Sequence, residues 1–114
     1  MAFDWREYLV VADELAKDRR QGMLRTSISR AYYCIYHLGL DYAQRHSFTE
    51  TLPSLHRKLW AWYQKQPDKR MKELGVLGAR LKESRIEADY NGLPITGQML
   101  EVCLARAHEF EQRV

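Results

Sequence analysis

Cysteine, glycine and proline are scarce in this sequence of 114 residues. Its two cysteines, Cys34 and Cys103, are too few for a disulfide scaffold. Six glycines and three prolines are too few for many short strands joined by tight turns. No stretch approaches the ~20 uncharged residues that a membrane span needs. These shortages argue against a cross-linked domain, an all-β fold and a transmembrane protein.

What the sequence does contain favours one all-α domain over residues 1–114. Hydrophobic residues make up 46% and charged residues 29%, which suffices for one core. The commonest residues, among them Ala, Leu, Arg, Lys and Glu, are strong helix formers. Nine charged side chains among the first twenty residues are unlike a signal peptide, so we expect a cytoplasmic protein with reduced thiols.

Apolar residues recur with the helical period of about 3.6 and are interrupted by stop signals, which predicts five helices. Asp4 opens the first with a capping box to Glu7, and Pro53 lies in the first turn of the third. Short connections favour antiparallel neighbours, so we expect a five-helix up-and-down bundle. The expected helices run from Asp4 to about 18–22, over about 23–46, from Pro53 to Pro67, over about 69–90, and onward from a cap at Thr96.

The net charge of +3 is unevenly distributed. Residues 56–72 hold six Lys or Arg against one Asp, and residues 17–30 hold five against one. From Glu83 onward six acidic residues face three arginines. Each basic tract is either a face that attracts phosphates or an ordinary solvated helix face.

Several chemistries have no motif in this sequence. The four histidines are never spaced i, i+4 and the cysteines are far apart, so no local metal signature exists. Gly75-x-x-Gly78 lies within a helical pattern and resembles no phosphate-binding loop. No serine occupies a nucleophile elbow. We therefore expect neither a metal nor a cofactor.

Two polar groups of residues remain as candidate sites. On the helix of residues 23–46, Arg30 and His37 share a face ~10.5 Å apart along the axis, with Tyr33 on the same side. An arginine and a histidine together can hold a phosphate and move a proton. The same face is alternatively a solvated or subunit-facing polar stripe.

The second group lies near the end of the helix of residues 69–90. Arg85 and Asp89 are spaced i, i+4, so their side chains can touch at the margin of the apolar stripe. Asp89 either holds Arg85 for an anionic substrate or completes a structural ion pair. The nearby aromatic tracts, residues 32–36 and 60–63, either stack on bases or fill the core.

These residues resemble a known family. Ser27-x-x-Arg30-Ala31-Tyr32-Tyr33-x-x-Tyr36-His37 resembles the S-x-R-x-Y-Y-x-x-F-H stretch of prokaryotic HEPN-domain proteins. Arg85-x-x-Ala88-Asp89-Tyr90 is similar to the R-x-x-A-D-Y signature of one branch. Residues 5–15 and 55–59 also resemble that branch, so the likeness extends over most of the chain.

The resemblance implies a helical bundle that dimerises and is encoded beside a minimal nucleotidyltransferase, as a toxin–antitoxin or defence pair. Many HEPN proteins are metal-independent ribonucleases in which an arginine holds the scissile phosphate and a histidine helps the 2′-hydroxyl attack. In these ribonucleases four to six residues separate the arginine from the histidine, on a late helix. No histidine follows Arg85 within six residues here, whereas Arg30 and His37 have this spacing on an earlier helix. The resemblance implies these candidates: Arg85, Asp89, His37 and Arg30 as catalytic, and Tyr33, Tyr90, Ser27, Arg57 and Lys58 as binding residues.

Three functions stay open at this point. The first is an RNA-directed enzyme, specifically an endoribonuclease toxin. The second is a non-catalytic module that binds RNA, a nucleotide or a nucleotidyltransferase partner. The third is a homodimeric scaffold without an anionic ligand. Convergence of Arg30, His37 and Arg85 on one cleft would favour the enzyme.

Overall fold

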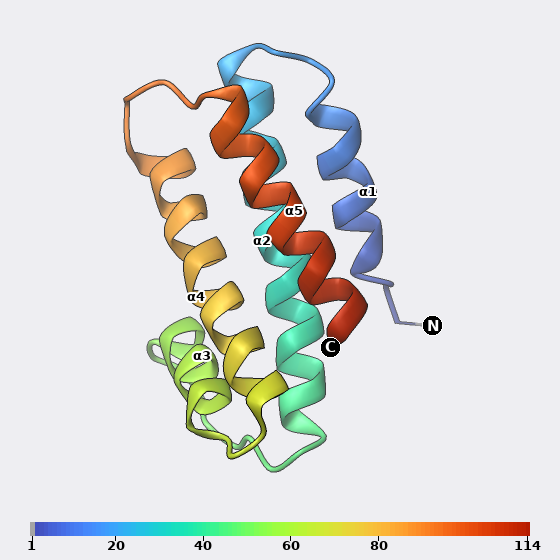
Figure 1. Cartoon of the computed structure of the whole chain (residues 1–114), viewed down its shortest axis with the longest axis vertical. Coiled ribbons are helices and arrows are strands. Elements are labelled where there is room, and N and C mark those ends of the chain that lie inside the picture. Colours follow the sequence, from blue (N-terminus) through green and yellow to red (C-terminus); the bar gives the residue numbers. More distant parts are fainter. Residues whose placement is uncertain (1) are drawn as a thin grey trace.

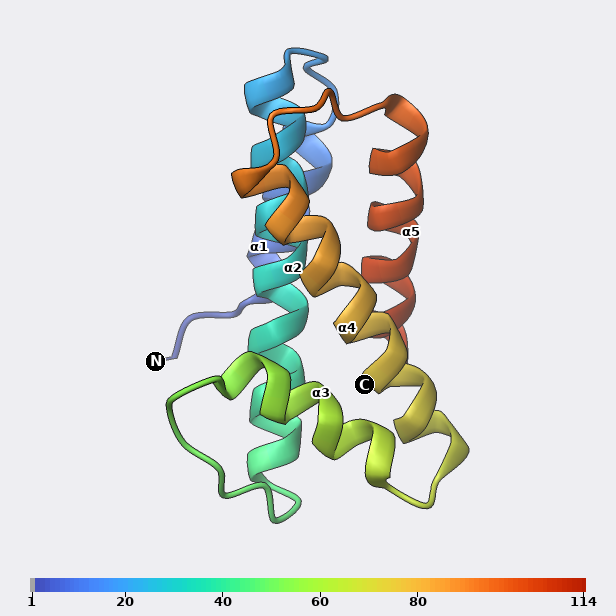
Figure 2. The same ribbon diagram turned by 90° about the vertical axis from the view of Figure 1, so that its left-hand side faces the viewer.

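The computed structural model describes residues 2–114, and all of its regular structure within that range is helical (Figure 1). The five helices are α1 (Arg6–Leu15), α2 (Gln21–Gln44), α3 (Leu55–Lys65), α4 (Lys69–Tyr90) and α5 (Gly97–Arg113). Helices α1, α2, α4 and α5 alternate in direction, whereas α3 crosses one end of the bundle (Figure 2). The all-α class is thus confirmed, and the up-and-down order applies to every helix except α3. None of these helices has the length and apolarity needed to cross a membrane.

Helix α2 is the centre of the bundle because it packs against each of the other four helices. The sequence predicts a narrow apolar stripe on it, from Leu24 to Tyr42. The buried surface is much wider, since neighbours surround the helix, while Leu38 and Tyr42 are only half-buried. Its buried residues are Leu24, Ser27, Ile28, Ala31, Tyr32, Cys34, Ile35, Tyr36, Gly39 and Ala43.

Helix α1 is shorter than its sequence pattern predicts. The Asp4 carboxylate accepts a hydrogen bond from the Arg6 backbone N–H at 3.0 Å, but within residues 2–114 Glu7 returns none, so the capping box is incomplete. The helix ends at Leu15. Beyond it, the Asp18 carboxylate binds both the backbone N–H and the guanidinium of Arg20, which holds the connection to α2 as a turn.

The prediction that Pro53 lies in the first turn of a helix is wrong. Ser54 has a φ of 59°, in the left-handed region, and α3 begins only at Leu55. Helical geometry cannot include that conformation, so Pro53 remains in the connection, where it follows a cis peptide bond.

Both ends of α4 and the start of α5 lie where the sequence predicts them. Asp68 caps α4 by accepting from the Arg70 N–H at 2.7 Å, and Thr96 caps α5 by accepting from the Met99 N–H at 3.1 Å. At the far end of α4, Arg25 of α2 donates to the carbonyls of Ala88, Asn91 and Leu93. This contact fixes the end of α4 against α2.

Trp60 joins α3 to the bundle. Its ring is 2% exposed and lies against Gly39 of α2 and Gly78 of α4. A Cβ atom at Gly78 would collide with the ring, whereas a Cβ atom at Gly39 would come within 3.0 Å of it, which is a tight contact. Its Nε1–H donates to the Tyr32 hydroxyl at 3.2 Å. Gly39 is thus a point of close approach between α2 and α3, and the hydrogen bond from Trp60 positions Tyr32 beside the residues described next.

Candidate functional site

Arg85 is a half-buried cation at the contact between α4 and α2. Its side chain is 13% exposed, and its Nη1 lies 3.4 Å from an Asp89 carboxylate oxygen, which confirms the predicted pair. The guanidinium carbon lies 5.7 Å from the ring centroid of Tyr32 and 5.5 Å from that of Tyr33. Within residues 2–114, its buried Nε has no hydrogen-bond partner. A buried donor without a partner is costly. Because Nε is enclosed, only the terminal nitrogens of the guanidinium can meet an anion.

His56, the second residue of α3, lies beside Arg85. Its ring stacks on Tyr36 with centroids 3.8 Å apart, and its Nδ1 lies 2.6 Å from the Tyr32 hydroxyl. Burial, followed by the positive charges of Arg85 and Lys82, lowers the pKa of His56 to about 4. The imidazole is therefore neutral near pH 7, and its Nε2 makes no hydrogen bond with any described residue.

The sequence motifs do not reveal His56 as a site residue. It lies 29 residues before Arg85 and on another helix, whereas the family spacing joins an arginine and a histidine on one helix. One signal was present: His56, Trp60 and Tyr63 follow each other at i, i+4 and i+7. That spacing puts the histidine on the inward face of α3.

Arg30 turns toward α1, and His37 turns toward Trp5, the residue just before α1. The His37 ring stacks on Trp5 at 3.5 Å and also approaches Tyr36, at 5.2 Å, and burial lowers its pKa. His37 therefore lies at the edge of the group of side chains around Arg85 and His56. Arg30 is exposed over the Tyr8 ring, 4.8 Å away, and shares none of the contacts of Arg85. The three residues do not converge on one cleft.

Ser27 is a structural residue rather than a binding residue. It is fully buried, and its hydroxyl donates to the Ala12 carbonyl at 2.7 Å. The hydroxyl is used to join α2 to α1, so it offers nothing to a ligand.

The other predicted binding residues lie at the surface. Tyr33 is half-buried against Arg85, whereas Tyr90 is 78% exposed at the end of α4. Arg57 is exposed on α3. Lys58 donates to the Thr51 carbonyl at 3.1 Å and lies 3.8 Å from Glu50, so it stabilises the preceding loop.

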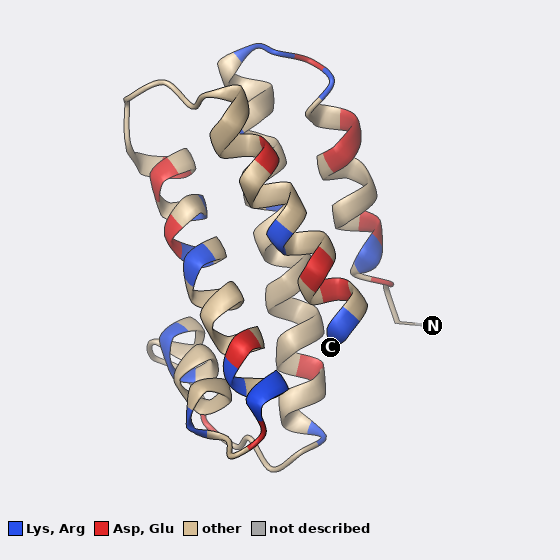
Figure 3. Cartoon of the chain, viewed as in Figure 1, with Lys and Arg blue, Asp and Glu red and all other residues tan. Residues whose placement is uncertain are grey.

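Lysine and arginine are frequent on α3 and in the first turns of α4, and both basic and acidic residues are scattered over the other helices (Figure 3). The basic tract of residues 56–72 thus forms one end of the molecule. Lys82 connects this end to the cluster, because its charge acts on His56.

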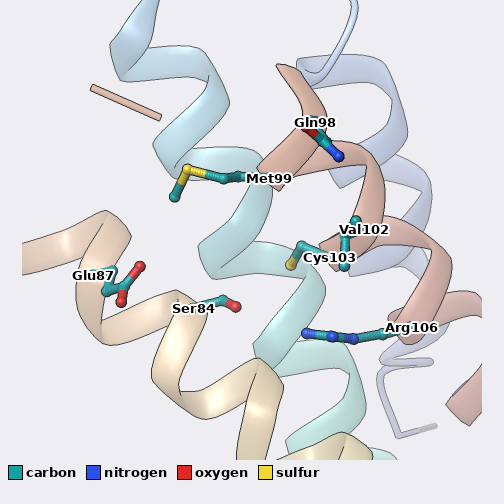
Figure 4. A pocket seen from close by; sticks show the side chains of 7 residues that line it. All are labelled: Ser84, Glu87, Gln98, Met99, Val102, Cys103 and Arg106. Atoms are coloured by element: carbon teal, nitrogen blue, oxygen red, sulfur yellow. The ribbon is translucent and has the colours of Figure 1, made fainter. Parts of the chain in front are cut away.

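A separate hollow lies between α4 and α5, lined by Ser84 and Glu87 on one side and by Met99, Cys103 and Arg106 on the other (Figure 4). It has a volume of about 320 Å³ and contains no predicted site residue. Burial raises the pKa of Cys103 to about 12, so the thiol stays protonated and unreactive near pH 7.

No group of three or more His, Cys, Asp or Glu within residues 2–114 is placed to hold a metal ion. The chemistry available in the described chain is therefore that of the cluster of Arg85, His56, Tyr32, Tyr33 and Asp89, called the Arg85 cluster below.

Comparison with known proteins gives no match to a family model, a curated protein or a solved structure.

Proposed function

We propose that the chain is a HEPN-like protein of a prokaryotic toxin–antitoxin or defence system that binds single-stranded RNA through a phosphate at Arg85. The observation that carries this proposal is the Arg85 guanidinium, a cation whose side chain is 13% exposed and whose one hydrogen bond within residues 2–114 is to Asp89. A guanidinium held in place by Asp89 and two aromatic rings is preorganised for a phosphate oxygen.

The hydrogen bonds around His56 support binding. Trp60 Nε1–H donates to the Tyr32 oxygen, which leaves the Tyr32 hydroxyl proton free to point at Nδ1 of His56. In that arrangement the imidazole proton lies on Nε2. The His56 Nε2–H is then a second donor near Arg85, and no described residue accepts from it.

RNA cleavage is the second candidate function, and the neutral state of His56 favours it. In the other tautomer Nδ1–H donates to Tyr32, and Nε2 is free to take the proton of a ribose 2′-hydroxyl. The 2′-oxygen then forms a bond to phosphorus and the bond to the 5′-oxygen breaks. This gives a 2′,3′-cyclic phosphate and a 5′-hydroxyl, with the proton returned to the leaving oxygen. The phosphate's negative charge raises the pKa of His56 and makes it a better base.

One set of measurements separates these functions. Purified protein is incubated with single-stranded RNA and excess EDTA, and both binding and cleavage are followed. Arg85→Gln is expected to abolish both. His56→Gln keeps a donor and is expected to retain binding while losing any cleavage.

His46→Gln is the matched control, because His46 lies on an exposed ring stack with Tyr42, away from the cluster. Absence of RNA binding by the unmutated chain over a range of RNA sequences contradicts the proposal. If the chain binds RNA without cleaving it, the result supports the non-catalytic module and contradicts the ribonuclease.

The partner proposal concerns a minimal nucleotidyltransferase and a second copy of this chain. The exposure of Tyr90 at the end of α4 supports the nucleotidyltransferase as a partner, because a modifying enzyme needs access to that side chain. Co-expression with a nucleotidyltransferase encoded beside it is expected to add a nucleotide to Tyr90, detected by intact-mass and peptide mass spectrometry. An unmodified Tyr90 beside an active enzyme contradicts this part.

A further inference from the structure

Two hollows flank α3, which faces the viewer in Figure 2. The first, about 270 Å³, lies between α3 and α4 and includes Lys82. The second, about 250 Å³, lies between α3 and the preceding loop and includes Phe48, Trp62 and Lys65. Arg57 lines both, so the hollows meet at this side chain.

Three cations along these hollows are free for a ligand. Within residues 2–114, Arg57, Lys65 and Lys82 have no carboxylate oxygen within ion-pair distance, although Glu83 lines the first hollow and Glu50 the second. Lys82 lies three residues before Arg85 on α4, one helical turn away. The row of cations therefore starts at Lys82 beside the Arg85 cluster and continues through Arg57 to Lys65 on α3.

Trp62 supplies an aromatic surface in the second hollow. Its ring is only half-buried, and it is held edge-on by Phe48 at 5.9 Å and by Tyr63 at 5.2 Å. Trp60, by contrast, is enclosed in the core. A fixed, open aromatic ring between cations is the arrangement on which unpaired bases stack in single-stranded nucleic acid binding.

We infer that the hollow beside Trp62 is a nucleotide subsite for the RNA strand that leaves the Arg85 cluster. The inference rests on the proposed function and adds the path of the strand. Phosphates lie against Lys82, Arg57 and Lys65, and one base stacks on Trp62. Because stacking needs an unpaired base, the subsite selects single-stranded over double-stranded RNA.

The charge part of the inference is tested by anisotropy of a fluorescein-labelled oligouridylate in EDTA. The double variant Arg57→Gln/Lys65→Gln is expected to bind more weakly. The slope of log affinity against log salt should become shallower by about 0.7 for each phosphate that the variant no longer neutralises. Lys17→Gln/Arg80→Gln removes the same charge at two residues that line neither hollow, and it is expected to keep the slope.

The stacking part is tested at Trp62. Trp62→Ala is expected to weaken oligouridylate binding by about 5- to 150-fold, and Trp62→Phe to restore part of it. Heparin, a polyanion without bases, is expected to bind the Trp62→Ala variant and the unmutated chain equally. Thermal melting of each variant shows whether the fold is retained.

Equal oligouridylate binding by a folded Trp62→Ala variant overturns the subsite, as does an equal loss of heparin binding. If Arg85→Gln no longer binds oligouridylate while the Arg57, Lys65 and Trp62 variants still bind it, the proposed function is supported and the subsite is contradicted. If the unmutated chain binds no RNA, both fall.

Discussion

Arg85 keeps its charge near the core because one carboxylate and two aromatic rings replace part of its water. Such a pair contributes little net stability, since desolvation offsets the attraction. The unpartnered Nε lowers that contribution further. At the residue scale, then, the arginine is better explained by what it can bind than by what it stabilises.

Replacement of Arg85 with Met tests this interpretation. The methionine keeps an apolar stem against Tyr32 and Tyr33, and Asp89 is exposed enough to be solvated. We expect the free energy of unfolding to change by less than about 1 kcal/mol while RNA binding is lost. A loss of about 3–5 kcal/mol in urea denaturation would instead identify a structural ion pair.

The second prediction at this scale concerns acid stability. The pKa of His56 falls from 6.5 to about 4 on folding, so between these values the unfolded chain binds a proton that the folded chain does not. The free energy of unfolding should therefore decrease as the pH falls from about 6.5 toward 4. His37 acts in the same direction.

Urea denaturation between pH 7 and about 4.5 measures this decrease. His56→Gln should make the profile flatter over this range. Asp18, whose pKa is lowered to about 2 by Arg20, loses its contribution only below the range of His56. A profile unchanged by His56→Gln contradicts the assignment.

At the scale of single elements, the position of α3 depends on how closely Trp60 approaches its neighbours. Helix ends with side-chain caps could be predicted from sequence, because Asp68 and Thr96 bond to N–H groups two or three residues away. The crossing of α3 could not be predicted from the sequence, and neither could the proximity of His56 to Arg85 that results from it. These depend on space left by glycines on two other helices, which no local pattern encodes.

Gly78→Ala tests the role of this space. The added Cβ collides with the enclosed Trp60 ring, and overpacking of this kind typically costs about 1–3 kcal/mol. Because Trp60 donates a hydrogen bond to Tyr32 of the Arg85 cluster, displacement of Trp60 should also weaken RNA binding. Gly22→Ala is the control: its Cβ meets nothing within 4 Å, and alanine in a helix is expected to stabilise slightly. If thermal melting shows that Gly78→Ala and Gly22→Ala change the stability equally, this explanation is contradicted.

At the scale of the whole molecule, the described helices share one core. Trp60, Tyr63 and Phe110 bring α3 and α5 together around α2. We therefore expect all five helices to unfold in one cooperative transition. Far-ultraviolet circular dichroism, which follows helix content, and tryptophan fluorescence should give the same midpoint in urea. An earlier fluorescence transition would show that α3 separates from the rest.

The arrangement of the Arg85 cluster also has a consequence during protein synthesis. Tyr32, His56 and Arg85 come from three helices that leave the ribosome one after another, and N-terminal segments emerge first. Until α4 has emerged, the growing chain has no Arg85 for His56 to meet. A protein that acts on RNA with this cluster would thus be harmless to the ribosome and messenger that are making it until translation is well advanced.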